Sequence, residues 1–211
     1  MATLFVDKID PQSGTTLTIG SSGDTVSLGS GATSSGNFGN LVLLNSQTVS
    51  SAVATVAFDN TYFTDDYEYY KILFYKALPS ATNSSLQLEY SIDNGSNFLS
   101  GAINTMRMFS QLDSANTGTE IGAGTGDTRF ATNISNTASK GVQGEIIFFN
   151  LRQTWTKWVN AHAIGQENSQ MYQWRVGSFI NSTDKINYMR FFWGGGANFT
   201  NGRFDLYGVR S

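Results

Sequence analysis

The sequence predicts an all-β protein, and its composition and patterning support that prediction in two ways. Ser, Thr, Asn and Gly make up 86 of the 211 residues, and these residues compete with helical hydrogen bonds or favour strands and turns. No stretch keeps a 3.6-residue apolar period, whereas many short stretches alternate apolar and polar residues. Short strands with polar turns are typical of a two-sheet structure, so we expect a jelly-roll-like antiparallel β-sandwich.

About nine strands are expected between residue 41 and residue 211. They cover residues 40–46, 51–58, 67–78, 85–92, 144–151, 154–164, 170–180, 185–194 and 203–209. Residues 110–140 have little hydrophobic pattern, and we expect a long loop there that is functional or mobile.

Alternation within two of these strands predicts which side chains share a face. In residues 67–78 one face is formed by Tyr69, Lys71, Leu73 and Tyr75, and the other by Tyr70, Ile72, Phe74 and Lys76. In residues 85–92 the inward face is formed by Leu86, Leu88, Tyr90 and Ile92.

The first 40 residues contain few large apolar side chains, and the stretch 16–21 is echoed by 25–30. Such a segment cannot offset an ordering entropy of about 1 to 2 kcal/mol per residue by itself. We therefore expect residues 1–40 to be an extended N-terminal anchor and oligomerisation segment, and residues 41–211 to be the β-sandwich domain. The expected contact residues are the apolar positions of the echo, Leu17, Ile19, Val26 and Leu28. A disordered leader is the alternative.

Charge and composition exclude several classes of function. The chain has 13 Lys+Arg against 16 Asp+Glu, a net charge of −3, so we expect no nucleic-acid partner. The absence of Cys excludes disulfides, thiolate nucleophiles and Cys-ligated zinc. No apolar run approaches the ~20 residues of a spanning helix, and the first residues lack a signal-peptide pattern. We therefore expect that the protein does not insert into a membrane and that it is made in the cytoplasm.

Groups suited to catalysis are scarce. The single histidine, His162, is expected to be a packed or surface residue of a strand, because nucleophilic triads and most zinc sites need further partners. Glu89 and Glu145 could form the carboxylate pair of a glycoside hydrolase, although both occupy polar positions where a solvated carboxylate is expected. We therefore expect no enzymatic activity, no catalytic residue, and no metal or cofactor.

Three further features have both a structural and a functional interpretation. Asp59, Asp65 and Asp66 lie in one loop that could hold calcium, but solvated carboxylates are favoured. The stretch 91–98, Ser-x-Asp-x-Gly-x-Asn-Phe, resembles the structural Asp-box turn and predicts a tight hairpin turn. Of four Trp residues, we expect three in the core or a subunit interface and one available for stacking on a sugar or protein partner.

Several short motifs resemble those of tailed-bacteriophage tail fibres and related virion surface proteins. The leader contains Pro11, the stretch Ser13–Thr16, and Gly23–Val26, which match the P-x-S-G-T-T opening and G-D-T-V repeats of such proteins. The chain closes with Phe204-x-Leu206-Tyr207-Gly208, similar to the terminal strand of small phage β-domains, and residues 67–98 resemble the sheet-forming core of those domains.

This resemblance implies a non-enzymatic structural protein of the virion, assembled on the surface of the phage particle. A short tail fibre or receptor-binding knob for host attachment is expected, because the chain lacks a long repetitive shaft. The expected partners are sister copies in a homotrimer, other virion proteins of the tail or capsid, and a host surface glycan or protein. A capsid decoration protein or head fibre is the alternative, followed by a carbohydrate-binding module.

Overall fold

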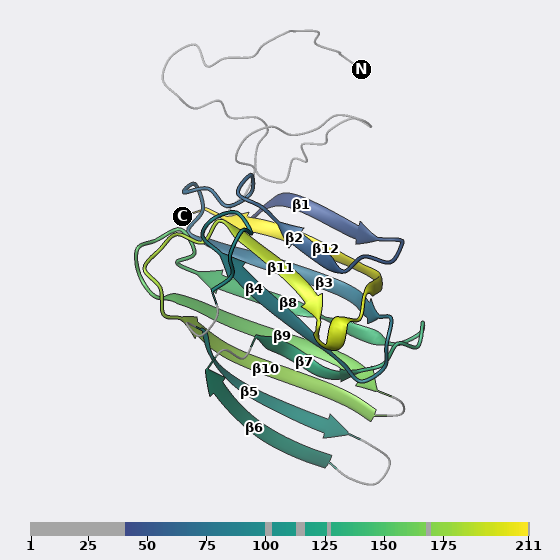
Figure 1. The fold of residues 1–211 in the computed structure, drawn as a ribbon. Helices are drawn as coiled ribbons and strands as arrows, with labels where there is room; N and C mark the ends of the chain where they lie inside the picture. The colour runs from purple at the N-terminus through teal and green to yellow at the C-terminus, as the bar shows by residue number, and fades with distance from the viewer. Residues whose placement is uncertain (1–40, 100–102, 113–116, 126–127, 168–169, 211) are drawn as a thin grey trace, which may run out of the picture. The chain divides into compact units, whose positions relative to one another are not determined.

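The computed structural model describes residues 41–99, 103–112, 117–125, 128–167 and 170–210, which form an antiparallel β-sandwich (Figure 1). These residues form twelve strands and one short 3-10 turn. The strands are β1 (Leu41–Val49), β2 (Thr55–Phe58), β3 (Tyr69–Pro79), β4 (Ser84–Ser91), β5 (Ile103–Leu112), β6 (Thr117–Thr125), β7 (Arg129–Ile134), β8 (Gly141–Phe149), β9 (Lys157–Glu167), β10 (Gln170–Ile180), β11 (Tyr188–Trp193) and β12 (Phe199–Val209), and the turn is η1 (Gly194–Gly196).

The strands form two sheets. The larger has eight strands in the order β1-β12-β3-β8-β9-β10-β5-β6, and the smaller has four in the order β2-β11-β4-β7. Figure 1 shows the smaller sheet in front of the larger one, with β5 and β6 extending beyond its edge. Strand β7 contacts β8, β9 and β10, so the two sheets pack face to face around one core.

Eight of the strands, β2 to β8 and β11, follow jelly-roll order. If these eight strands are counted from 1 to 8 along the chain, the smaller sheet has the order 1-8-3-6, which is β2-β11-β4-β7. The larger sheet contains the order 2-7-4-5, which is β3, β8, β5 and β6. The antiparallel pair β9 and β10 is inserted between β8 and β5, while β1 and β12 extend the sheet beyond β3. The predicted jelly-roll-like sandwich is therefore confirmed.

The prediction of a long loop over residues 110–140 is wrong. The chain forms β5, β6 and β7 between Ile103 and Ile134, so only short connections separate these strands. Among the described strands, β6, with the sequence TGTEIGAGT, pairs only with β5 at the edge of the larger sheet. Its Gly and Thr content hides the alternation that identifies a strand with one buried face.

The core is formed by the inward side chains of both sheets, and most of the predicted alternation is confirmed. Tyr70, Ile72 and Phe74 of β3 are buried, as are Leu86, Leu88 and Tyr90 of β4. The predictions for two residues are wrong. Lys76 is exposed because β3 bulges there, with a positive φ of 46°. Ile92 is exposed because β4 ends at Ser91.

The stretch 91–98 forms a compact turn, but the predicted hairpin is wrong, because β4 and the next strand, β5, lie in different sheets. The Ser91 hydroxyl accepts a hydrogen bond from the Gly95 N–H at 3.0 Å, and the Asp93 carboxylate accepts bonds from the Asn97 N–H at 2.8 Å and its side-chain amide at 2.6 Å. Bonds from Ser91 and Asn97 lower the pKa of Asp93 to about 2. Gly95 has a φ of +87°, which glycine adopts without strain.

Lys157 is fully buried at the start of β9. Its Nζ donates hydrogen bonds to the carbonyls of Gln153 at 2.9 Å, Trp155 at 2.8 Å and Ser182 at 2.9 Å. Burial lowers the pKa of Lys157, and the negative charge of Asp184 partly opposes that effect. The ammonium thus joins the β8–β9 connection to the segment after β10.

The four predicted anchor residues, Leu17, Ile19, Val26 and Leu28, lie outside the described residues. Their contacts, and the division into residues 1–40 and 41–211, stay predictions.

Candidate functional site: the outward face of the eight-stranded sheet

The outward-pointing residues of the larger sheet, called here the outer face, gather most of the exposed apolar side chains. Twelve large apolar residues are exposed in the described part of the chain. Nine of them lie on this face: Leu41, Leu43, Tyr75, Met106, Met108, Phe149, Trp158, Ile164 and Met171. The other three, Val53, Ile92 and Trp155, lie between strands. Exposed apolar residues gathered on one face indicate an interaction site, whereas single scattered ones do not.

A row of mainly aromatic residues crosses five strands of this face. Cross-strand pairing aligns Val209 of β12, Tyr69 of β3, Phe149 of β8, Trp158 of β9 and Phe179 of β10. The rings of Tyr69 and Phe149 are 5.7 Å apart between centroids, and those of Trp158 and Phe179 are 5.6 Å apart. These spacings are typical of interacting aromatic pairs, and Trp158 is still 53% exposed.

Polar groups on the outer face are paired for the most part. Lys71 and Glu145 form an ion pair at 2.6 Å, and the Gln173 side-chain amide lies 2.8 Å from Nε2 of His162. Asp205 is buried and bonded to Ser46 at 2.5 Å and to Arg203 at 2.8 Å. The bond with Asp205 raises the pKa of Arg203. This face therefore combines apolar side chains with charges that neutralise each other locally.

Two cations on this face lack a partner. Among the Lys and Arg residues in the described ranges, Lys76 and Arg175 alone have no hydrogen bond, ion pair or ring contact. Both are exposed. Each is therefore available to an anionic group from another molecule.

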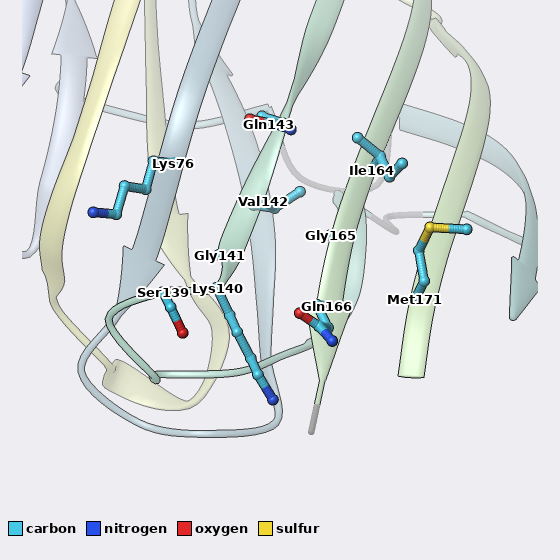
Figure 2. Close-up of a pocket in the computed structure, with 10 residues that line it drawn as sticks. All are labelled: Lys76, Ser139, Lys140, Gly141, Val142, Gln143, Ile164, Gly165, Gln166 and Met171. Atoms are coloured by element: carbon cyan, nitrogen blue, oxygen red, sulfur yellow. The ribbon is translucent and has the colours of Figure 1, made fainter. Parts of the chain in front are cut away.

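Three hollows open on the outer face. The largest, shown in Figure 2, has a volume of about 450 Å³ and is lined by Lys76, Gln143, Ile164, Met171 and neighbouring residues at the β7–β8 connection. A second of about 320 Å³ lies over β3, β8 and β9 and includes Tyr75, Gln143, Glu145 and His162. The third, of about 170 Å³, is lined by Met106, Met108, Asn160, Arg175, Val176 and Gly177.

The structure does not bring the two candidate hydrolase carboxylates together. Glu89 lies on the outward face of the smaller sheet, where it pairs with Arg190 at 2.7 Å. Glu145 lies on the outer face of the larger sheet. The two carboxylates therefore point away from opposite sides of the sandwich, whereas glycoside hydrolysis needs them on either side of one bond.

The three loop carboxylates proposed for calcium are each bonded within the protein. Asp65 pairs with Arg152 at 3.0 Å and Lys185 at 2.6 Å, and the hydrogen bond from Lys185 is the main cause of its lowered pKa. Asp66 accepts a bond from Thr64, and Asp59 accepts one from the Thr61 N–H. The described residues contain no group of three or more His, Cys, Asp or Glu side chains placed to hold a metal ion.

The other two sequence predictions concern His162 and the tryptophans. His162 shares an exposed strand face with Trp158, Asn160 and Ile164, as predicted. Trp174 and Trp193 are buried, whereas Trp158 and Trp155 are exposed. The sequence predicts that three of the four Trp residues lie in the core or in a subunit interface. Two lie in the core, and the prediction for a third depends on whether a subunit interface covers Trp158.

Sequence reasoning missed Met106, Met108, Arg175 and Gly177 as members of one surface. Alternation in residues 170–180 already places Arg175 and Gly177 on the face opposite Trp174 and Val176. Nothing in the local pattern shows that β5 pairs with β10, which brings the two methionines beside them.

Comparisons with known proteins give no match to a family model, a curated protein sequence or a solved structure. Within the described ranges there is no helix long and apolar enough to cross a membrane.

Proposed function

We propose that this chain is a non-enzymatic surface protein of a phage particle, a short tail fibre or receptor-binding knob that uses the outer face of its larger sheet for attachment. The observation that carries the proposal is the concentration of nine exposed large apolar residues on that one face. The motifs of the leader and of the last strand, which resemble those of virion proteins, give the proposal its biological setting.

The composition of the outer face favours binding. Interface cores are enriched in Tyr, Trp, Phe, Met and Arg, and depleted in Lys, Glu and Asp. The outer face carries Trp158, Met106, Met108 and Arg175, and its carboxylates Glu145 and Asp205 are paired within the protein. Such a surface stabilises a complex by removing apolar area from water, at roughly 25 cal/mol per Å².

The same observation also supports a second candidate, in which the outer face packs against sister copies. A cyclic homotrimer would cover it and protect sheet edges such as β6. In this second candidate the chain is a capsid decoration protein or head fibre. In that case the face is buried before any host cell is met, and attachment must use another surface.

Adsorption competition tests the first proposal. Host cells preincubated with the purified full-length protein should adsorb fewer phage particles, because the protein occupies the receptor. The double variant Trp158→Gln, Met106→Gln should lose this inhibition, whereas Trp155→Gln, which changes an exposed Trp between strands, should keep it. Full inhibition by the double variant contradicts the assignment of the outer face.

Light scattering and particle composition test the second candidate. A stable trimer that the double variant turns into monomers assigns the face to self-association. Mass spectrometry of purified particles separates the two locations, since a few dozen copies indicate a tail appendage and hundreds indicate capsid decoration. Absence of the protein from the particle rules out both.

A further inference from the structure

The hollow around Gly177, called here the Gly177 notch, is the smallest of the three described hollows on the outer face. Gly177 of β10 pairs with Asn160 of β9 on one side and with Met106 of β5 on the other. A Cβ atom built on Gly177 has no heavy atom within 4 Å. The notch measures about 170 Å³, smaller than the roughly 300 to 1,000 Å³ of drug-sized sites. It therefore has room for a single ring-sized group.

The notch is lined by groups that recognise a carboxylate with hydroxyl neighbours. Arg175 has no partner within the described residues, and a guanidinium binds a carboxylate through two parallel hydrogen bonds. The Asn160 amide offers both donors and an acceptor, and Met106 and Met108 flank the notch with polarisable apolar surface. An occupant with one anionic edge, polar substituents and an apolar face matches this lining.

An aromatic platform borders the notch. Trp158 precedes Asn160 by two residues on the same face of β9, a distance of about 7 Å along the strand. Its ring packs against Phe179, which follows Gly177 by two residues on β10. A pyranose ring presents C–H groups on one face and hydroxyls at its edge, so it can stack on Trp158 while its substituents reach the notch.

The charged residues on the rest of the outer face also favour an anionic ligand. The second unpaired cation, Lys76, lines the hollow in Figure 2. That hollow shares Gln143 with the one containing His162, and His162 is the cross-strand partner of Arg175. The three hollows thus lie next to one another across the sheet, with Lys76 in the first and Arg175 in the third. The whole chain has a net charge of −3, but the first and last of these hollows each contain an unpaired cation. This arrangement favours a repeating anionic ligand over a neutral one.

We infer that the Gly177 notch binds a sugar unit bearing a carboxylate, within an acidic polysaccharide that continues toward Lys76. Arg175 pairs with the carboxylate, Asn160 bonds ring hydroxyls, and Trp158 stacks on the sugar face. This inference rests on the proposed attachment role of the outer face, and it names the class of receptor that the face takes.

Binding of matched acidic and neutral probes to the full-length protein tests this inference. The acidic probes are sialyllactose and a glucuronate-containing hyaluronan hexasaccharide, and the neutral ones are lactose and chitohexaose. By isothermal titration calorimetry, at least one acidic probe should bind about tenfold or more tightly than its neutral match, because a charge-assisted bidentate contact is lost. Equal affinity within both pairs, or no binding of either acidic probe, overturns the inference.

Gly177→Leu is the decisive variant because it fills the notch from a position with open space. The melting temperature should not fall, since no neighbour lies near the new Cβ and leucine suits a strand better than glycine does. Affinity for the acidic probe should fall about tenfold or more, and Arg175→Ala should give a similar loss. Lys185→Ala, which removes a cation paired with Asp65 away from this face, is the control and should bind as the unmodified protein does.

The outcomes separate this inference from the proposed function. If Gly177→Leu binds the acidic probe with unchanged affinity, the notch is not the site. If Gly177→Leu instead dissociates an oligomer seen by light scattering, the occupant is another copy of the chain, and the sugar assignment is wrong. If the unmodified protein binds the acidic probe but does not inhibit phage adsorption, the proposed attachment role is wrong and the sugar site stands.

Discussion

The two outward faces of the sandwich have the same alternating strand pattern, but only one of them covers its own apolar groups. On the smaller sheet, Arg190 pairs with Glu89 at 2.7 Å and lies 3.8 Å above the ring of Phe98. Gln87 accepts a hydrogen bond from Thr128. None of the exposed large apolar residues in the described ranges lies on that face.

The outer face of the larger sheet contains the same residue types in a different arrangement. Within the described residues, Arg175 on this face is unpaired, and no cation lies above the exposed ring of Trp158. The smaller sheet shows that an outward face of this sandwich can fold with its aromatic residues covered by the protein's own side chains. This contrast supports the proposal that the outer face is used by a partner.

The largest expected effect concerns the buried cation Lys157 at the start of β9. Lys157→Met removes the donor for three carbonyls at the start of β9, the strand that carries Trp158. Because unsatisfied buried groups cost about 1 to 3 kcal/mol each and the desolvation of the ammonium is relieved, we expect a loss of about 3 kcal/mol in the free energy of unfolding. Urea denaturation measures it, and a loss below about 0.5 kcal/mol contradicts the role of Lys157 in joining the two segments.

The two arginines give the most direct test of the comparison. Arg190→Ala should lower the free energy of unfolding by about 1 to 2 kcal/mol, because it removes a partly buried ion pair and the cation above Phe98. Arg175→Ala should change it by less than about 0.5 kcal/mol, since Arg175 has no partner in the described part of the chain. If denaturation curves show equal losses in the free energy of unfolding for the two variants, Arg175 also has a partner within the protein and the comparison fails.

Polar substitution of the outer face should affect surface behaviour while leaving stability nearly unchanged. We expect Met106→Gln, Met108→Gln and Trp158→Gln together to reduce binding of an apolar fluorescent dye and to shift the free energy of unfolding by less than about 1 kcal/mol, since all three side chains are exposed. The matched change Phe192→Gln on the smaller sheet should leave dye binding unaltered. A substantial loss of stability in the triple variant would mean that these side chains pack within the protein.

The smallest expected effect concerns Asp93 in the turn after β4, outside both faces. Its pKa of about 2 in the folded protein lies below the ordinary value of 3.8, so its ionised form stabilises the fold above about pH 4, and this contribution is lost as the pH falls toward 2. Asp93→Asn should melt at a lower temperature than the unmodified protein at pH 7, with the two curves converging near pH 2. A gap that is independent of pH would assign the effect to geometry alone.

Part of the fold could be predicted because it depends on local periodicity. Alternation grouped Tyr70, Ile72 and Phe74 on one face, which is buried, and it identified the inward face of residues 86–90. It also placed His162 on the same strand face as Trp158. It failed at Lys76, where a bulge breaks the period, and at residues 110–140, where Gly- and Thr-rich strands show no apolar period. Both failures occur where pairing with a neighbouring strand, which local sequence does not encode, sets the conformation.

The sequence by itself determined the fold class of this protein and the face on which most strand residues lie, because successive side chains of a strand point to opposite sides whatever its partner is. Only the tertiary structure decided which strands are neighbours. The pairing of β5 with β10 brings Met106 and Met108 beside Arg175 and Gly177, and the assignment of β4 and β8 to different sheets separates Glu89 from Glu145. These are contacts between distant parts of the chain, chosen by packing of the whole core, so no local pattern carries them.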